Sequence, residues 1–161
     1  GEHGWWSKNT NYEITTRTAL LASVPGLTRG EKTDALCELV DIYPSLCELA
    51  GLPIPPHMEG DSFAPLLREP TRPWKQAAFS VWTGSRTIRT DRYRLIRYDE
   101  AKSEKTVWQF PSEGTLELFD HAVDPDENVN VAEQPEYREI LDSLVQQLEA
   151  GYEAARPKSD R

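Results

Sequence analysis

The sequence has little of the side-chain chemistry that builds metal or disulfide sites. Its 161 residues include two cysteines, three histidines and a single methionine. Cys37 and Cys47 lie too far apart for a disulfide if both sit on or near one short helix, so we expect two free, buried thiols. His3, His57 and His121 share no ligand spacing, which predicts no metal site built within this chain.

Positive charge and long apolar runs are also scarce. The 27 acidic residues outnumber the 18 lysines and arginines and give a net charge of -9. Because phosphate binding needs clustered Lys and Arg, we expect no nucleic-acid partner. An anionic small substrate is compatible with this balance, since local charge in a pocket can oppose the net charge. No apolar run approaches the roughly 20 residues of a membrane-spanning helix, so no membrane span is expected.

The first seventeen residues stand out by composition. They hold two glycines, two adjacent tryptophans, a lysine, two asparagines and an arginine. The apolar positions follow neither a period of two nor one of 3.6, which predicts an irregular segment. Irregular segments with this much aromatic and cationic side chain are typical of functional sites. A chain terminus with a few buried rings would have the same composition.

This stretch resembles the type I sulfatases, which have the alkaline-phosphatase-like superfold. The matching residues are Gly1-Glu2-His3-Gly4, Trp6, Lys8-Asn9-Thr10-Asn11 and Thr16-Arg17. They are most similar to the "GEHG-x-W-x-K-x-T-N-x-E…TR" run of the iduronate-2-sulfatase-like branch. Further matches follow in the family's order over most of residues 1–155, at 40–46, 49–52, 60–63, 88–94, 117–120 and 124–125.

The resemblance implies roles for individual residues of the opening segment. Lys8 stands where the family's lysine contacts the sulfate group, so it is the catalytic residue expected in this chain. Trp6 and Asn11 are the expected substrate-binding residues, with Trp6 lining the sugar pocket and Asn11 orienting the loop. Arg17 is expected to be structural.

Other parts of the family's active site are absent from the chain. The family's nucleophile is a cysteine in a Cys-x-Pro-x-Arg context that is converted to formylglycine. Cys37 precedes Glu-Leu-Val and Cys47 precedes Glu-Leu-Ala, so neither has this context. The family's calcium is held by paired aspartates and an Asp-His pair, which are also missing. We therefore expect formylglycine and calcium in the full-length enzyme, with their residues upstream, and neither bound by this chain.

The start of the chain fits a piece of a longer enzyme. Residue 1 is glycine and the only methionine is Met58, so we expect a truncated or cleaved product that is the C-terminal portion of a sulfatase. Its expected partners are a sulfated sugar and the missing N-terminal portion. The chain alone is predicted to be inactive. By the same resemblance, its compartment is periplasmic, secreted or lysosomal.

The predicted fold is of the α/β class, truncated: residues 1–73 form the end of the large α/β domain. The active-site loop covers 1–17. The apolar run 18–24 ends at a Pro-Gly pair, and such a run is typical of a strand buried on both faces of a sheet. A helix is predicted over 42–50, with an aspartate before it and a glycine after it. The proline-rich residues 52–73 are predicted to be an extended linker that contains one short helix.

Residues 74–161 are predicted to be a C-terminal antiparallel subdomain. Five short β-rich runs occur between turn signals, at 79–82, 87–90, 93–98, 107–110 and 116–119. The second and third form a hairpin with its turn near Asp91. A helix over 135–152 opens at Pro135 and repeats its apolar residues, Leu144 among them, at spacings of three and four. It should cover one face of the sheet.

Five arginines fall close together in this subdomain, at 86, 89, 92, 94 and 97. They suggest either a polyanion-binding patch or solvated strand faces paired with the chain's many carboxylates. We expect the second, which is the commoner arrangement in an acidic chain.

The leading hypothesis is therefore the C-terminal part of a sulfuric-ester hydrolase that acts on a sulfated sugar or glycan. Two alternatives remain. The chain could be a non-catalytic assembly subunit or fragment, or part of a related phosphoester hydrolase of the same superfold. The fold does not separate these chemistries.

Overall fold

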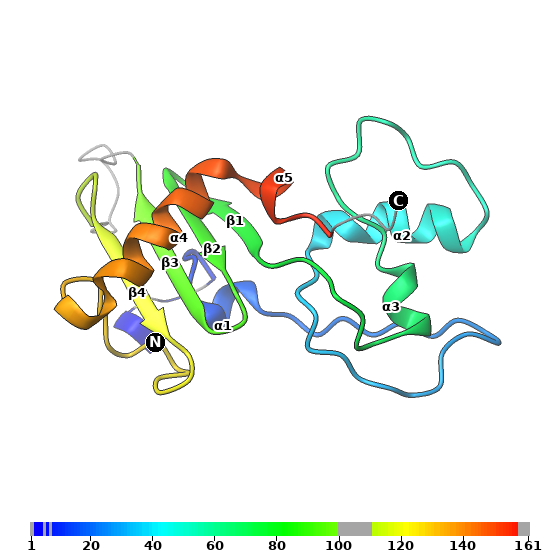
Figure 1. Cartoon of the computed structure of the whole chain (residues 1–161), viewed down its shortest axis with the longest axis horizontal. Coiled ribbons are helices and arrows are strands. Elements are labelled where there is room, and N and C mark those ends of the chain that lie inside the picture. Colours follow the sequence, from blue (N-terminus) through cyan, green and yellow to red (C-terminus); the bar gives the residue numbers. More distant parts are fainter. Residues whose placement is uncertain (1, 5, 7, 100–110, 158–161) are drawn as a thin grey trace. The chain divides into compact units, whose positions relative to one another are not determined.

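The computed structural model describes residues 2–4, 6, 8–99 and 111–157 (Figure 1). They form two compact units. The sheet unit consists of Gly1–Thr18 and Phe79–Ala154, and the loop-rich unit consists of Ala19–Ala78 and Ala155–Arg161. The opening residues group with the sheet and not with the segment that follows them. The reason is hydrogen bonding, since Asn11 and Glu13 both bond to sheet residues.

In the described part of the chain, four strands form the sheet, in the order β1-β2-β3-β4. They are β1 (Ala78–Trp82), β2 (Ser85–Arg89), β3 (Tyr93–Tyr98) and β4 (Leu116–Asp120). β2, β3 and β4 pair antiparallel, so the predicted hairpin with its turn near Asp91 is confirmed. Thr83 and Gly84 join β1 to β2 with φ of 39° and 75°, the left-handed pair of a tight hairpin turn. The predicted run 107–110 lies outside the described residues.

The terminal helix is present as α4 (Arg138–Ala150), after a 3-10 turn at Pro135–Tyr137. Proline suits this first turn because it has no N–H to leave unpaired. Gly151, with φ of 77°, ends the helix. The buried residues of α4 recur at spacings of three and four and are Leu141, Leu144 and Leu148. An antiparallel sheet covered by a terminal helix is therefore confirmed.

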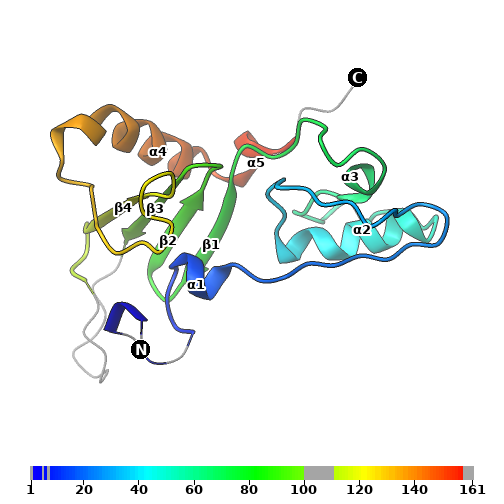
Figure 2. The same ribbon diagram turned by 90° about the horizontal axis from the view of Figure 1, so that it is seen from below.

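The two faces of the sheet have different cover. Successive side chains of a strand point to opposite faces, while residues directly opposite each other on paired strands share a face. One such row is fully buried and consists of Ile88, Leu95 and Leu118. On the other face Ile96 packs against Tyr12 of the opening segment. Figure 2 shows α4 on one side of the strands and α1 (Glu13–Thr16) on the other.

The strand predicted over 18–24 is not formed in this chain. All seven residues are described, and none of them belongs to a strand. A strand needs a neighbour for its N–H and C=O groups, and no described segment pairs with this one. Most of its apolar side chains are exposed, with Leu21 87% exposed. In this chain the apolar run is therefore an irregular segment without a partner strand among the described residues.

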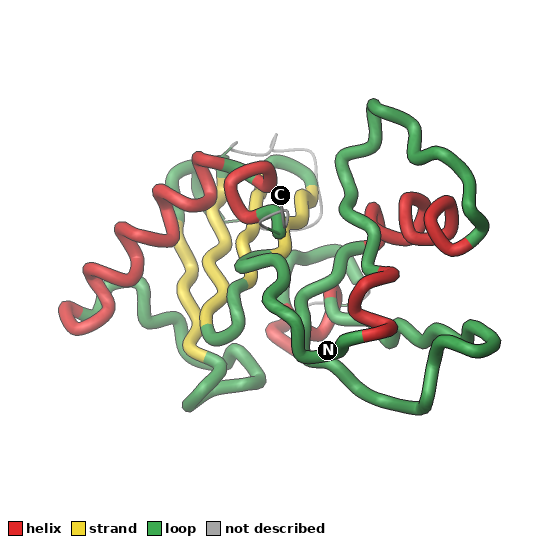
Figure 3. The backbone as a smooth tube through the Cα atoms, turned by 45° about the vertical axis from the view of Figure 1, so that its right-hand side comes forward, coloured by secondary structure: helices red, strands yellow, loops and turns green. Residues whose placement is uncertain are grey.

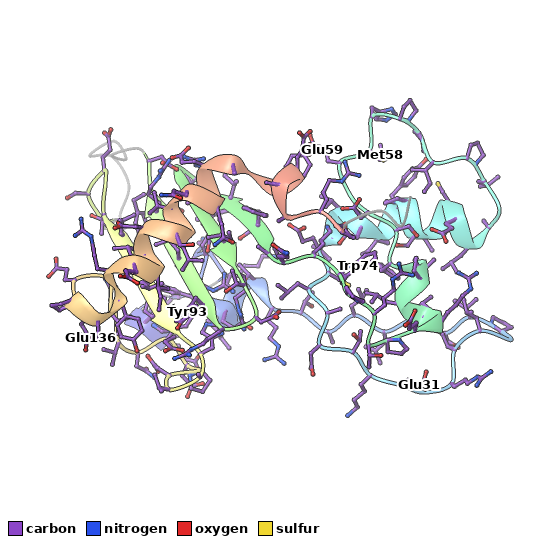
Figure 4. All side chains as sticks on the ribbon, viewed as in Figure 1. Glu31, Met58, Glu59, Trp74, Tyr93 and Glu136 are labelled. Carbon is purple, nitrogen blue, oxygen red and sulfur yellow. The ribbon has the colours of Figure 1, made fainter. Side chains whose placement is uncertain are left out.

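The described residues of the loop-rich unit form two short α-helices and a 3-10 turn at Leu39–Asp41 among long irregular segments (Figure 3). α2 (Ile42–Leu49) confirms the helix predicted over 42–50. α3 (Ala64–Arg68) is the short helix expected within the proline-rich linker. Met58 and Glu59, labelled in Figure 4, lie in the loop between the two helices.

Asp41 organises the loop-rich unit by accepting hydrogen bonds from three directions. Its carboxylate accepts the Glu38 N–H and the Asp61 N–H, each at 2.8 Å, and the Lys75 ammonium at 2.6 Å. Burial lowers the pKa of Lys75, but the hydrogen bonds from the ammonium to Asp41 and Glu38 outweigh this and raise it. Gly60 must pass close to this centre, because a Cβ there would lie 2.1 Å from the Val40 carbonyl oxygen.

Both cysteines are free, as predicted. Cys47 is buried, whereas Cys37 is only partly so. Burial raises the pKa of the Cys37 thiol to about 11, so it stays protonated near neutral pH. None of the described helices combines the length and the apolar character that a membrane crossing requires.

Candidate functional site

The opening segment is attached to the sheet by aromatic and hydrogen-bond contacts. His3 stacks on Tyr12 with ring centroids 4.3 Å apart. The Tyr12 hydroxyl donates to Glu117 at 3.1 Å, and the Tyr98 hydroxyl donates to the same carboxylate at 2.9 Å. Burial raises the pKa of Glu117 against the lowering effect of these two donors. Burial and the nearby Glu117 raise the pKa of both tyrosines. His3 is thus fixed through Tyr12.

Asn11 is 4% exposed, and its side-chain amide is bonded to the sheet. Its amide nitrogen donates to the Ser85 hydroxyl at 3.0 Å and to the Ser85 carbonyl at 3.2 Å. Its amide oxygen accepts a hydrogen bond from the Ser80 hydroxyl at 2.9 Å. These contacts fit the loop-orienting role expected of Asn11. Its direct contact with a substrate stays a prediction.

Glu13 and Glu127 meet at a buried arginine. Arg94 donates from Nε to Glu127 Oε1 at 2.7 Å and from Nη2 to Glu13 Oε2. Its Nη1 donates to the Asn11 carbonyl at 2.9 Å. Burial raises the pKa of Glu13, but its hydrogen bond and charge interaction with Arg94, helped by Arg89, outweigh this and lower it. Asn11 and Glu13 of the opening segment are therefore both held by Arg94 of β3.

Lys8 and Trp6 lie in the sequence between two attached residues, His3 and Asn11. Both side chains are exposed, Trp6 to 72%. A purely structural Lys8 would be expected to pair with a nearby carboxylate such as Glu13. Glu13 instead pairs with Arg94, Arg89 and Arg17. The described residues include no hydrogen-bond or ion-pair partner of the Lys8 ammonium.

The fold brings together a possible metal-ligand set that the sequence spacing did not reveal. Ligand atoms of Glu13, His121 and Glu127 lie within 4.8 Å of one another. His121 Nε2 is 2.7 Å from Glu127 Oε1, the oxygen that Arg94 also contacts. Because Arg94 bonds to both carboxylates and Arg89 pairs with Glu13, two guanidinium groups of the protein already meet the two negative charges of this cluster. The residues therefore do not fit a calcium site.

A hollow of about 480 Å³ lies beside the opening segment. Its lining includes Glu2, Glu13 and Asp126, opposed by Arg17 and the ring of His3. Three carboxylates against one guanidinium make it a poor site for an anionic sulfate group. The hollow adds nothing to the argument for substrate binding.

The five arginines confirm the expectation of ion pairs with the chain's carboxylates. Their partners are Asp99 for Arg86, Glu13 for Arg89, Asp120 for Arg92, Glu13 and Glu127 for Arg94, and Asp99 and Glu149 for Arg97. Arg92 also lies 4.9 Å from the ring centroid of Tyr93, which Figure 4 labels on β3. Arg94 is the exception to the expected solvation, since its side chain is 3% exposed.

The sequence analysis missed the positions that hold the opening segment, namely Arg94, Glu127 and His121. One signal for Arg94 was available. In a strand over 93–98, Arg94 shares its face with Ile96, and an arginine on an apolar face implies a buried carboxylate partner. Nothing local marks Glu127, because its partner lies 33 positions away in the chain.

The fold and the opening segment are those of a sulfatase C-terminal portion. The family described as "N-sulphoglucosamine sulphohydrolase, C-terminal" matches residues 1–154, and the chain belongs to it. Human arylsulfatase K is 31% identical over 160 residues, which are 91% of this chain and 28% of that protein. An arylsulfatase of Clostridium perfringens is 32% identical over 148 residues, covering 89% of this chain and 29% of its own length. The chain thus spans less than a third of these relatives.

Solved structures agree on the fold. BT4656, solved in complex with its substrate D-glucosamine-2-N,6-O-disulfate, matches with a TM-score of 0.80 and 25% identity, over 99% of this chain and 33% of that one. The phosphonate monoester hydrolase of Agrobacterium radiobacter matches with a TM-score of 0.57 and 23% identity, over 75% of this chain and 26% of that one. The likeness to the phosphonate monoester hydrolase concerns the fold alone, because one fold can carry both sulfate-ester and phosphonate-ester hydrolysis.

Proposed function

We propose that this chain is the C-terminal part of a sulfuric-ester hydrolase that acts on a sulfated sugar or glycan. One observation carries the proposal. In a chain of the sulphohydrolase family, Lys8 is exposed and has no partner among the described residues, while Asn11 to Glu13 are fixed to the sheet. A cation held on an anchored segment without a carboxylate partner suits an anionic group brought by a substrate.

In this proposal Lys8 places its ammonium beside the sulfate group. There it stabilises negative charge that develops on the sulfate and leaving-group oxygens, and a preorganised charge does this better than water. Trp6 offers an exposed apolar ring against which a sugar can pack. By family resemblance, a formylglycine upstream supplies the nucleophile. Calcium would be held by residues outside this chain, because the two carboxylates of the described cluster, Glu13 and Glu127, are already paired with Arg94 and Arg89.

The rest of the enzyme is the expected partner of the loop-rich unit. Large apolar side chains are exposed on α2 and the segments that flank it, namely Leu39, Val40, Tyr43, Leu46, Leu52 and Ile54. Exposed apolar side chains in such number are typical of a surface that another protein segment covers. The chain's relatives are more than three times as long, since it spans 28% of human arylsulfatase K. We propose that the missing N-terminal portion covers this surface.

The finer substrate assignment rests on resemblance. The opening motif is most similar to the iduronate-2-sulfatase-like branch, while the substrate of BT4656 is a sulfated glucosamine. The substrate that the name of this branch implies and the substrate of BT4656 are both sulfated sugars. A sulfated sugar is therefore the substrate class proposed. The compartment proposed from the same family is the periplasm, the lysosome or the outside of the cell. A phosphoester hydrolase is the alternative chemistry, which the fold likeness to the phosphonate monoester hydrolase leaves open.

The test compares ester classes on the full-length protein that carries this chain. With calcium supplied, an aryl sulfate and sulfated disaccharides should be turned over faster than the matching aryl phosphate and phosphonate. The isolated 161-residue chain serves as the negative control and should hydrolyse none of them. Preference for the phosphate or phosphonate ester would support the alternative chemistry. No turnover of any ester by a folded full-length protein would support a non-catalytic subunit.

A further inference from the structure

Arg94 is the most completely buried of the five arginines between residues 86 and 97. Its side chain is 3% exposed, compared with 17% to 53% for the others. It projects from β3 on the face that receives the opening segment. Its three donor nitrogens bond to Glu127, to Glu13 and to the Asn11 carbonyl. A fixed fork of donors suits this task, because a lysine could not reach three acceptors in one plane.

Glu127 completes the attachment from the loop after β4. Its Oε2 accepts the backbone N–H of Glu13 at 2.7 Å, while its Oε1 accepts from Arg94 at 2.7 Å and contacts His121 Nε2 at 2.7 Å. Glu127 has a φ of 57°, a left-handed conformation that is unfavourable for a residue with a Cβ. The carboxylate contacts offset that backbone cost. A glycine would relieve the backbone but leave Arg94 and the Glu13 N–H without this acceptor.

These contacts set how far Lys8 can move. Lys8 is three residues from Asn11, and an extended chain covers at most about 3.6 Å per residue. The Lys8 backbone is therefore tethered within about 11 Å of Asn11. Loosening Asn11 and Glu13 would widen the range that the ammonium explores. Misplacing a catalytic group by about 1 Å can cost about a hundredfold in rate.

We propose that the Arg94–Glu127 pair is a positioning device for the Lys8 loop. Arg94 and Glu127 touch no substrate in this proposal. They act by holding Asn11 and Glu13, so that Lys8 meets the sulfate group in one place. The inference rests on the proposed sulfatase function, but the anchoring itself can be measured without any activity.

The experiment uses the full-length protein and two readouts. Hydrogen exchange is followed for the backbone amides of residues 8–13, and kcat/KM is measured with an aryl sulfate. Arg94→Lys is the test variant. Arg97→Lys is the matched control, because Arg97 lies on the same strand but pairs with Asp99 and Glu149. Ser80→Ala removes only the hydroxyl that bonds to Asn11 and serves as a milder test if Arg94→Lys does not fold.

Arg94→Lys should speed exchange at residues 8–13 by at least about tenfold and lower kcat/KM by about 10–100-fold. Ser80→Ala should shift both in the same direction by less, and Arg97→Lys should shift neither. In a Lys8→Ala background, Arg94→Lys should cost little more, because its effect passes through Lys8. An equal further loss in that background would overturn the positioning role.

Exchange at the wild-type rate in both Arg94→Lys and Ser80→Ala would overturn the anchoring itself. If the wild-type protein hydrolyses no sulfate ester, the proposed function fails. The exchange measurement still decides whether Arg94 anchors the segment, so failure of the function and failure of the anchoring are told apart.

Discussion

Arg94 on β3 and Glu127 in the loop after β4 are joined by a hydrogen bond of 2.7 Å, and both side chains are withdrawn from water, at 3% and 1% exposure. A pair buried this deeply gives up the hydration of two charges, so its net contribution to stability is small or even unfavourable. Removing one partner is a different matter, because the charge that remains is buried and unpaired.

Glu127→Ala should therefore destabilise the sheet unit by about 3–5 kcal/mol. The loss comes from the Arg94 guanidinium and the Glu13 N–H, both of which lose an acceptor. Chemical denaturation of the purified chain measures it, with exposed Glu139→Ala as the control at under about 0.5 kcal/mol. Similar small effects for both variants would mean that Arg94 reaches water or another acceptor.

The same cluster predicts how stability depends on pH. Arg94 and Arg89 outweigh burial and lower the pKa of Glu13 below its usual 4.5. A carboxyl with a lowered folded-state pKa contributes stability above its unfolded-state pKa and loses it as the pH falls through the folded-state value. The chain should therefore lose stability as the pH drops below about 4.5.

Glu13→Gln tests this assignment because it removes the titrating group and keeps the side-chain shape. Unfolding midpoints measured between pH 6 and pH 3 should fall less steeply in this variant than in the wild type. Arg92 and other groups lower the pKa of Asp120 in the same direction, so part of the slope will remain. An unchanged slope would show that Glu13 is not one of the groups responsible.

Leu144 tests the packing of α4 on the sheet. Its side chain is 3% exposed in the middle of the buried stripe. Leu144→Ala should cost about 2–5 kcal/mol, the range for a leucine deleted from a core. Glu139→Ala on the same helix again serves as the exposed control. Equal effects of the two changes in a denaturation series would mean that the buried face of α4 has been misassigned.

Gly60 offers a test in the loop-rich unit. A Cβ at this position would lie 2.1 Å from the Val40 carbonyl oxygen, and backbone atoms cannot move aside as a flexible side chain can. Gly60→Ala should cost about 1–3 kcal/mol or more through overpacking. Gly30→Ala is the comparison, since its Cβ would meet nothing within 4 Å and only its φ of 74° opposes the change. A smaller loss for Gly60→Ala than for Gly30→Ala would contradict the close approach.

Local sequence patterns predicted the elements that are specified by residues close together in the chain. The 3-4 spacing of leucines specified α4, and the turn near Asp91 specified the β2–β3 hairpin. For the run 18–24 the pattern was not sufficient, because a buried strand and an exposed loop can have the same apolar composition. Only the presence of a partner strand distinguishes the two. The contacts of the candidate site were harder to predict from the sequence than these elements. Glu13 and Glu127 are 114 positions apart, so their contact depends on tertiary structure that no local pattern encodes.

The last prediction concerns Lys8, whose ammonium has no partner among the described residues, while the carboxylate nearest in sequence, Glu13, is paired with arginines. If Lys8 faces the sulfate group, Lys8→Ala in the full-length protein should lower kcat/KM by about 10²–10³, the scale for losing one preorganised charge partner. Stability should change by less than about 0.5 kcal/mol, because an exposed loop lysine contributes little to folding. Lys8→Arg should restore activity only in part, since a planar fork presents its donors differently from a compact ammonium. Near-normal kcat/KM in Lys8→Ala together with a clearly lower Tm would refute the catalytic role, because only a structural lysine gives that combination.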